Sequence, residues 1–180
     1  MRATRTRNGL AAFLVGALMA VASPAIAHAE SSQSNDLGQP RQESNTIKNL
    51  NSGKVLQAVS RDHGSRVVQQ TRVVGQNLQD WFLILDEPYR SFENFESGWN
   101  LGIDGASTAT GAAAITARGS SDANQDWVKD DDAYSGSYFA LRNRKSGKCL
   151  GISGGSTANG AQAAQFPCDG SRNQGWTLSN

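Results

Sequence analysis

Short runs of apolar residues alternate with polar residues through most of the chain after residue 45, and turn-forming residues separate one run from the next. Leu101 and Ile103 lie two positions apart, as do Leu150 and Ile152, a spacing that places both side chains of each pair on one face of a β-strand. The segments between the runs are rich in Gly, Ser and Asn, which favour tight turns. No segment beyond residue 29 sustains a helical period with capping residues. The pattern predicts an all-β, barrel-like fold of many short strands.

The pattern is repeated three times along the chain. Residues 93–127 align without a gap with residues 142–176, and a more divergent copy covers residues 47–81. Repeats of this length are typical of architectures built from one structural unit used several times. We therefore expect three related units over approximately residues 46–85, 89–130 and 138–180.

Each unit ends with a Gln two positions before a Trp. Residues two apart on a strand point to the same side, so the Gln is expected to turn inward with its Trp. Three related indole rings can fill one shared core, and each buried amide would be satisfied by the backbone of a loop in its own unit. The predicted structural core comprises Gln79, Trp81, Gln125, Trp127, Gln174 and Trp176.

The N-terminal residues have the layout of a secretory signal peptide. Three arginines precede an apolar run over residues 10–22, and small residues follow at the positions that a signal peptidase requires. The run is short for a membrane span, which disfavours the alternative of an uncleaved anchor. We predict a signal peptide over residues 1–29, a disordered polar linker over residues 30–45, and a secreted, extracellular domain over residues 46–180.

The net charge of the chain limits the classes of partner that it is expected to bind. The chain has 17 Lys and Arg against 16 Asp and Glu, and three of the arginines lie in the predicted signal peptide. The remainder is close to neutral, which gives no reason to expect nucleic acid or an anionic membrane as a partner.

The two cysteines, Cys149 and Cys168, both lie in the last unit, and the aligned positions of the other units lack both together. An exported chain matures in an oxidising compartment, so these residues are expected to form a disulfide bond. A metal site would need further ligands, and His63 is the one histidine beyond residue 29. We expect no metal and no cofactor.

The last unit reads SGKCLGI, NGAQ, FPCDG and NQGW in order. These motifs, together with the three Gln-x-Trp ends, resemble the ricin B-type β-trefoil lectins, which include the family 13 carbohydrate-binding modules of secreted bacterial enzymes. The resemblance covers roughly residues 46–180. It implies a β-trefoil of three pseudo-symmetric repeats with four strands each, and binding of galactose-type or xylan-type glycans in shallow sites, up to one per repeat.

The resemblance also assigns site positions, and the chain departs from the family at several of them. The family's sugar-binding Asp corresponds to Gln57, Gly102 and Gly151, its stacking aromatic residue to Thr71, Ala117 and Phe166, and its amide residue to Leu78, Asn124 and Asn173. The third repeat is therefore the best-preserved site, with Gly151, Phe166 and Asn173, and with Gln174 as support. Asp104 could replace the missing carboxylate of the second repeat, or it could be an exposed turn residue.

The sequence favours a secreted, non-catalytic, carbohydrate-binding protein. One alternative is a β-trefoil interaction or inhibitor protein that has lost its sugar sites, with Phe166 covering the disulfide bond and Asn173 holding a turn. Enzymatic activity is disfavoured because His63 is expected in an exposed loop and no pair of carboxylates is placed across a cleft.

Overall fold

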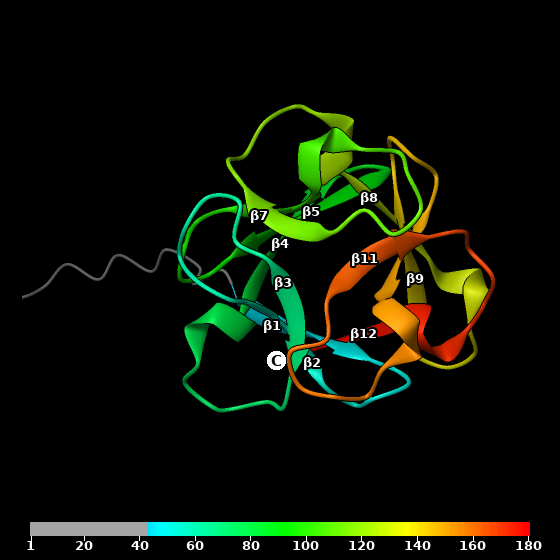
Figure 1. Ribbon diagram of the computed structural model, residues 1–180, viewed down its shortest axis with the longest axis horizontal. Helices are drawn as coiled ribbons and strands as arrows, with labels where there is room; N and C mark the ends of the chain where they lie inside the picture. The colour runs from blue at the N-terminus through cyan, green and yellow to red at the C-terminus, as the bar shows by residue number, and fades with distance from the viewer. Residues whose placement is uncertain (1–42) are drawn as a thin grey trace, which may run out of the picture. The chain divides into compact units, whose positions relative to one another are not determined.

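The computed structural model describes residues 43–180, and within this part of the chain twelve strands form a β-trefoil (Figure 1). The predicted signal peptide and most of the predicted linker lie outside the described residues. The first strand begins at Ser44, slightly before the expected start of the domain at residue 46. No helix of the described residues is long and apolar enough to cross a membrane.

Each repeat contributes four strands, as expected for a β-trefoil. The first repeat has β1 (Ser44–Asn49), β2 (Val55–Ala58), β3 (Val67–Gln70) and β4 (Trp81–Asp86). The second has β5 (Tyr89–Asn94), β6 (Asn100–Ile103), β7 (Ala114–Ala117) and β8 (Trp127–Asp130). The third has β9 (Phe139–Asn143), β10 (Cys149–Ile152), β11 (Ala163–Phe166) and β12 (Gly175–Ser179).

Short 3-10 helices connect several of these strands. They are η1 (Asn77–Gln79), η2 (Asp104–Ala106), η3 (Ala123–Gln125), η4 (Asp131–Ala133), η5 (Ser153–Gly155) and η6 (Arg172–Gln174).

Six strands close the barrel. Antiparallel pairing runs from β1 to β4, β5, β8, β9, β12 and back to β1. The remaining strands form three hairpins, β2–β3, β6–β7 and β10–β11. Isolated bridges join the hairpins to one another, Arg66 to Ile115, Val68 to Gln162 and Ala113 to Ala164, and Figure 1 shows β3, β7 and β11 around a common centre. A closed barrel leaves no free sheet edge.

Trp81, Trp127 and Trp176 are fully buried and belong to one core cluster, as the repeat pattern predicts. Each indole N–H donates to a carbonyl oxygen of its own repeat: Leu56 at 3.3 Å, Leu101 at 3.1 Å and Leu150 at 2.9 Å. The tryptophans therefore combine a large buried apolar area with a satisfied polar group.

The three Gln side chains are buried as expected, but the reason differs from the sequence argument. Gln79, Gln125 and Gln174 end 3-10 helices, whereas each Trp lies in the following strand. The amide groups of the three residues donate to loop carbonyls of their own repeats: Thr71 at 3.0 Å, Arg118 at 2.9 Å and Pro167 at 3.0 Å. The spacing of two thus marks a helix-to-strand junction in which the amide closes the preceding loop.

Three equivalent asparagines, which the sequence reasoning overlooked, join consecutive repeats. Asn49, Asn94 and Asn143 are buried at the ends of β1, β5 and β9. Their side-chain amides donate to the 3-10 helix regions of the neighbouring repeats, at the carbonyls of Asn173, Leu78 and Asn124. The sequence contained this signal, because an Asn occupies the same position in all three repeats, three residues before the Ser of each Ser-Gly turn.

Candidate functional site

The third repeat carries a shallow cleft of about 410 Å³ between β10, β11 and η6. Phe166, Asn173 and Gln174, three of the four residues singled out in the sequence, line it together with Asp169 and Ser171. The fourth, Gly151, lies directly behind them, since a Cβ at this position would lie 3.3 Å from Cδ2 of Phe166 and 3.4 Å from Nδ2 of Asn173. The fold therefore brings all four predicted residues together.

Gly151 sets how closely the cleft residues pack. A Cβ there would lie only 2.9 Å from Cγ of Gln174, a distance that would force neighbouring atoms to move. An Asp at this position would need the same space. The side chains of Phe166 and Gln174 therefore pack in space that the Cβ of the family's Asp would need.

Asn173 is oriented by its own repeat. Its Nδ2 donates to the carbonyl of Ile152 at 3.0 Å, while its Oδ1 has no hydrogen-bond partner among residues 43–180. The side chain is half-buried and lines the cleft. Its free acceptor can therefore receive a hydroxyl group from a ligand.

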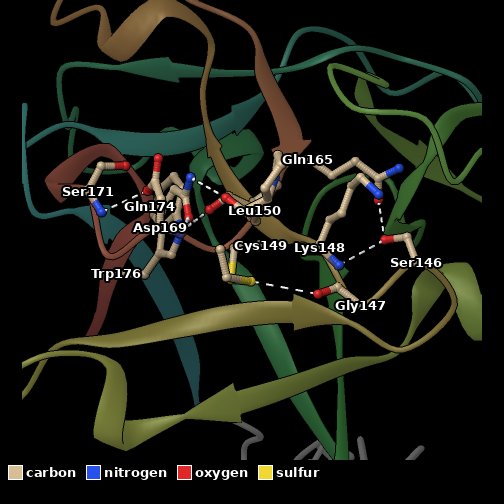
Figure 2. The surroundings of a disulfide bond; sticks show 12 residues. Ser146, Gly147, Lys148, Cys149, Leu150, Gln165, Asp169, Ser171, Gln174 and Trp176 are labelled. Atoms are coloured by element: carbon tan, nitrogen blue, oxygen red, sulfur yellow. Dashed lines mark hydrogen bonds between the residues drawn. A yellow bond between two sulfur atoms is a disulfide. The ribbon is translucent and has the colours of Figure 1, made fainter.

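Asp169 supplies a carboxylate that the sequence reasoning missed. It is exposed in the loop after Cys168, and its Oδ1 accepts a hydrogen bond from the backbone N–H of Ser171 at 2.9 Å. Hydrogen bonds from the side chain and the backbone of Ser171 lower the pKa of Asp169 below its ordinary value of 3.8, so the group is ionised at neutral pH. Figure 2 shows Asp169 and Ser171 beside Gln174. The cleft thus contains a ring, an amide and a carboxylate, although the carboxylate comes from a different position than in the family pattern.

The loop of Asp169 is held from two sides. Cys168 forms the predicted disulfide bond with Cys149 of β10, which confirms the pairing expected from the sequence. On the other side, the hydroxyl of Tyr134 donates to the carbonyl of Ser171 at 2.7 Å. Burial, with a smaller contribution from the charge of Asp169, raises the pKa of Tyr134 above 10.0. Figure 2 shows Cys149 between the cleft residues and the turn at Gly147.

Phe166 faces both structures that the sequence analysis considered for it. It pairs with Cys149 across the β10–β11 ladder, and it lines the cleft while remaining half-buried. The Phe166 ring can therefore both cover the disulfide bond and contact a ligand in the cleft.

The second repeat has a cleft of about 330 Å³ that differs in chemistry. Ala117 occupies the position of the family's stacking aromatic residue, so the second repeat lacks a ring at that position. Asp104 and Asp122 line the cleft, as do Arg118 and Asn124. Asn124 donates to the carbonyl of Ile103 at 3.2 Å, and its buried Oδ1 has no hydrogen-bond partner in the described part of the chain.

His63 reaches this second cleft from the first repeat. The residue is exposed, as expected, and its ring lies edge-on to Trp99, with centroids 5.9 Å apart. The guanidinium of Arg118 lies 5.9 Å from the centroid of the same Trp99 ring. These three residues are far apart in the sequence, and no spacing rule could have joined them.

In the first repeat, the family positions are occupied by groups that bond within the protein. Gln57, which replaces the family Asp, accepts a hydrogen bond from Nε2 of Gln79 at 2.8 Å. Thr71 donates its backbone N–H to Oδ1 of Asn159 at 3.0 Å. Among residues 43–180 there is no group of three or more His, Cys, Asp and Glu side chains that could hold a metal ion.

The closed barrel, the three hairpins and the shallow clefts beside them define a lectin-type β-trefoil. A family model described as ricin-type β-trefoil lectin domain-like matches residues 31–117 and 123–180. The chain therefore belongs to the ricin-type β-trefoil lectin domain-like family. No curated protein sequence matches it significantly.

Solved structures agree with this assignment. The chain is similar to the designed threefold-symmetric protein ThreeFoil, with 32% identity, a TM-score of 0.72, and coverage of 76% of this chain and 98% of ThreeFoil. It is also similar to an exo-β-1,3-galactanase from Clostridium thermocellum, with 30% identity and a TM-score of 0.72 over 77% of this chain, but it spans only 30% of that enzyme. The ricin B-like lectin of Macrolepiota procera, solved with lactose, has the same fold at 20% identity, with a TM-score of 0.67 over 77% of this chain and 96% of the lectin. Fold and family together support a carbohydrate-binding module.

Proposed function

We propose that this protein is a secreted, non-catalytic lectin module that binds galactose-type or xylan-type glycans through the third-repeat cleft. The observation that carries the proposal is the convergence of Phe166, Asn173 and Asp169 on one cleft. A ring can stack on the C–H face of a sugar, a carboxylate can accept hydrogen bonds from neighbouring hydroxyl groups, and an amide can read a further hydroxyl. These are the three kinds of contact that a shallow sugar site needs.

Comparison of the repeats favours the third over the second. Both contain an amide at the family position and nearby carboxylates, but Ala117 replaces the ring in the second repeat, whereas Phe166 provides it in the third. Lactose in the related Macrolepiota lectin and the galactanase to which part of this chain is similar support a galactose-type ligand. A single shallow site would bind a sugar at about millimolar Kd, corresponding to roughly 4 kcal/mol, and polymeric ligands would gain retention through avidity.

The test compares two Phe→Ala variants on a glycan array and in a xylan pull-down. Phe166→Ala should abolish the signal, because the stacking ring is lost. Phe95→Ala is the matched control: Phe95 is 45% exposed and packs against Phe82 outside the cleft, so its loss should leave glycan binding intact. Silence of the wild-type protein across all glycans would reject the proposal in favour of a β-trefoil interaction or inhibitor protein with degenerate sugar sites.

A further inference from the structure

A different cleft lies on the outer wall of the barrel, where the second and third repeats meet. It has a volume of about 190 Å³, and its lining includes Tyr89 of β5, Val128 of β8 and Arg142 of β9. Val128 and Arg142 are register partners. Arg142 is exposed while its neighbours Leu141 and Asn143 are buried, so its side chain is on the outside of the barrel. The cleft shares no lining residue with the third-repeat cleft.

The chain around this cleft is strongly basic. Four of the seven residues from 142 to 148 are basic, namely Arg142, Arg144, Lys145 and Lys148. Arg144 lies 4.3 Å from the ring centroid of Tyr89 and donates from Nη1 to Oδ2 of Asp126 at 2.9 Å. The side chains of Arg142, Lys145 and Lys148 have no ion pair or hydrogen bond to any of residues 43–180. The cleft therefore has one arginine fixed in place and one whose donors are all free.

The other two repeat junctions show that the fold does not require this arrangement. Aligning the repeats places Arg142 with Lys48 and Glu93, and Arg144 with Leu50 and Phe95. At the junction of the first and second repeats, the rings of Phe82 and Phe95 pack together, 5.1 Å apart. Paired arginines beside a tyrosine are thus a property of one junction and not of the scaffold.

We propose that this cleft binds a carboxylate or sulfate group carried by an acidic polysaccharide. A guanidinium presents parallel N–H donors that match the oxygens of these groups. Tyr89 and Val128 add an apolar surface against which the C–H face of the sugar can rest. The oriented Arg144 and the unpaired Arg142 would then hold the anion between them.

The near-neutral charge of the whole domain does not oppose such a site. Exposed charges act over a Debye length of about 8 Å at physiological ionic strength, so the local cluster decides what binds. Nucleic acid is less favourable than a polysaccharide, because a duplex carries one charge about every 1.7 Å. The phosphates of a duplex would be repelled by two nearby carboxylates. These are Asp126, which pairs with Arg144, and Glu87, which pairs with Arg90 at the start of β5.

The test measures binding of the full-length mature chain to immobilised dextran, dextran sulfate, polygalacturonate and duplex DNA. The wild-type protein should bind at least one of the two acidic polymers and not dextran, and about 200 mM salt should release it. Arg142→Glu should weaken this binding at least about tenfold, whereas Lys48→Glu, the same charge change at the equivalent exposed position of the first repeat, should change it less than about twofold. Arg142→Gln provides a second variant, and unchanged thermal melts show that all three variants fold.

Each outcome decides the proposal. Binding to polygalacturonate alone identifies a carboxylate ligand, and binding to dextran sulfate alone identifies a sulfate ligand. The proposal fails if neither polymer binds, if Lys48→Glu weakens binding as much as Arg142→Glu, or if duplex DNA binds as tightly as the polymers. Phe166→Ala should retain the acidic polymer, so failure of the third-repeat glycan site and failure of this site are separable.

Discussion

The indole N–H of Trp176 donates a hydrogen bond of 2.9 Å to the carbonyl oxygen of Leu150, the residue that precedes Gly151 in β10 (Figure 2). This bond links the centre of the fold to the back of the third-repeat cleft. The strand that carries Gly151 is thereby held in register with the barrel core. The geometry of the proposed sugar site therefore depends on the same tryptophan that fills the core.

Trp127→Ala is expected to destabilise the domain by about 3–5 kcal/mol, in line with other large-to-small substitutions in protein cores. Trp127 is fully buried and its N–H bonds to Leu101, so the change leaves both a cavity and an unpaired carbonyl. Trp99→Ala is the matched control, since Trp99 is only partly buried and should cost much less. Denaturant unfolding followed by circular dichroism provides the measurement, and equal losses in both variants would contradict the core role of Trp127.

Gly151→Ala is expected to weaken glycan binding, because the added Cβ would lie 2.9 Å from Cγ of Gln174 and 3.3 Å from the Phe166 ring. Gly102→Ala introduces a similar contact in the second repeat, 3.0 Å from Cγ of Gln125, and serves as control. Both variants should lose some stability, but only Gly151→Ala should lose affinity for the glycan identified on the array. Isothermal titration would show this, and equal affinities of the two variants would remove Gly151 from the site.

The success of the sequence-based prediction follows from the repeats. Strand positions, the buried tryptophans and the disulfide bond could be predicted because each rests on a local pattern or on a comparison between aligned repeats. The conformation of the Gln residues could not, because a spacing of two fits a strand and a helix-to-strand junction equally well. Asp169 was missed for a related reason: its loop position is not where the family places a carboxylate.

Contacts between side chains of different repeats could not be predicted from any local sequence pattern. His63 and Arg118 approach the same Trp99 ring from different repeats, and Tyr89 meets Arg144 across a repeat junction. Such pairs depend on how three units pack around an axis. The aligned asparagines at 49, 94 and 143 are an intermediate case, because their recurrence was visible in the sequence but their partners were not.

The pH dependence of stability should report on Asp169. Its pKa is lower in the folded protein than its ordinary value because Ser171 donates hydrogen bonds to the ionised form. A carboxyl group with a lowered folded pKa stabilises the fold above its unfolded pKa, and this contribution is lost as the pH falls through the folded value. The difference in melting temperature between the wild-type protein and Asp169→Asn should therefore be constant between about pH 5 and pH 8 and shrink below about pH 4. A difference that grew on acidification would have the wrong sign for this hydrogen bond.

Removal of the disulfide bond is expected to affect both stability and binding. In the chain-entropy picture, a cross-link that closes a loop of this length contributes about 3 kcal/mol, so the double variant Cys149→Ser, Cys168→Ser should melt at a lower temperature.

The disulfide bond also ties the loop of Asp169 to β10. Glycan affinity should therefore fall even at temperatures where the variant remains folded, as judged by tryptophan fluorescence. Unchanged glycan affinity in the folded double variant would show that the loop is held by Tyr134 and the Gln174 amide alone.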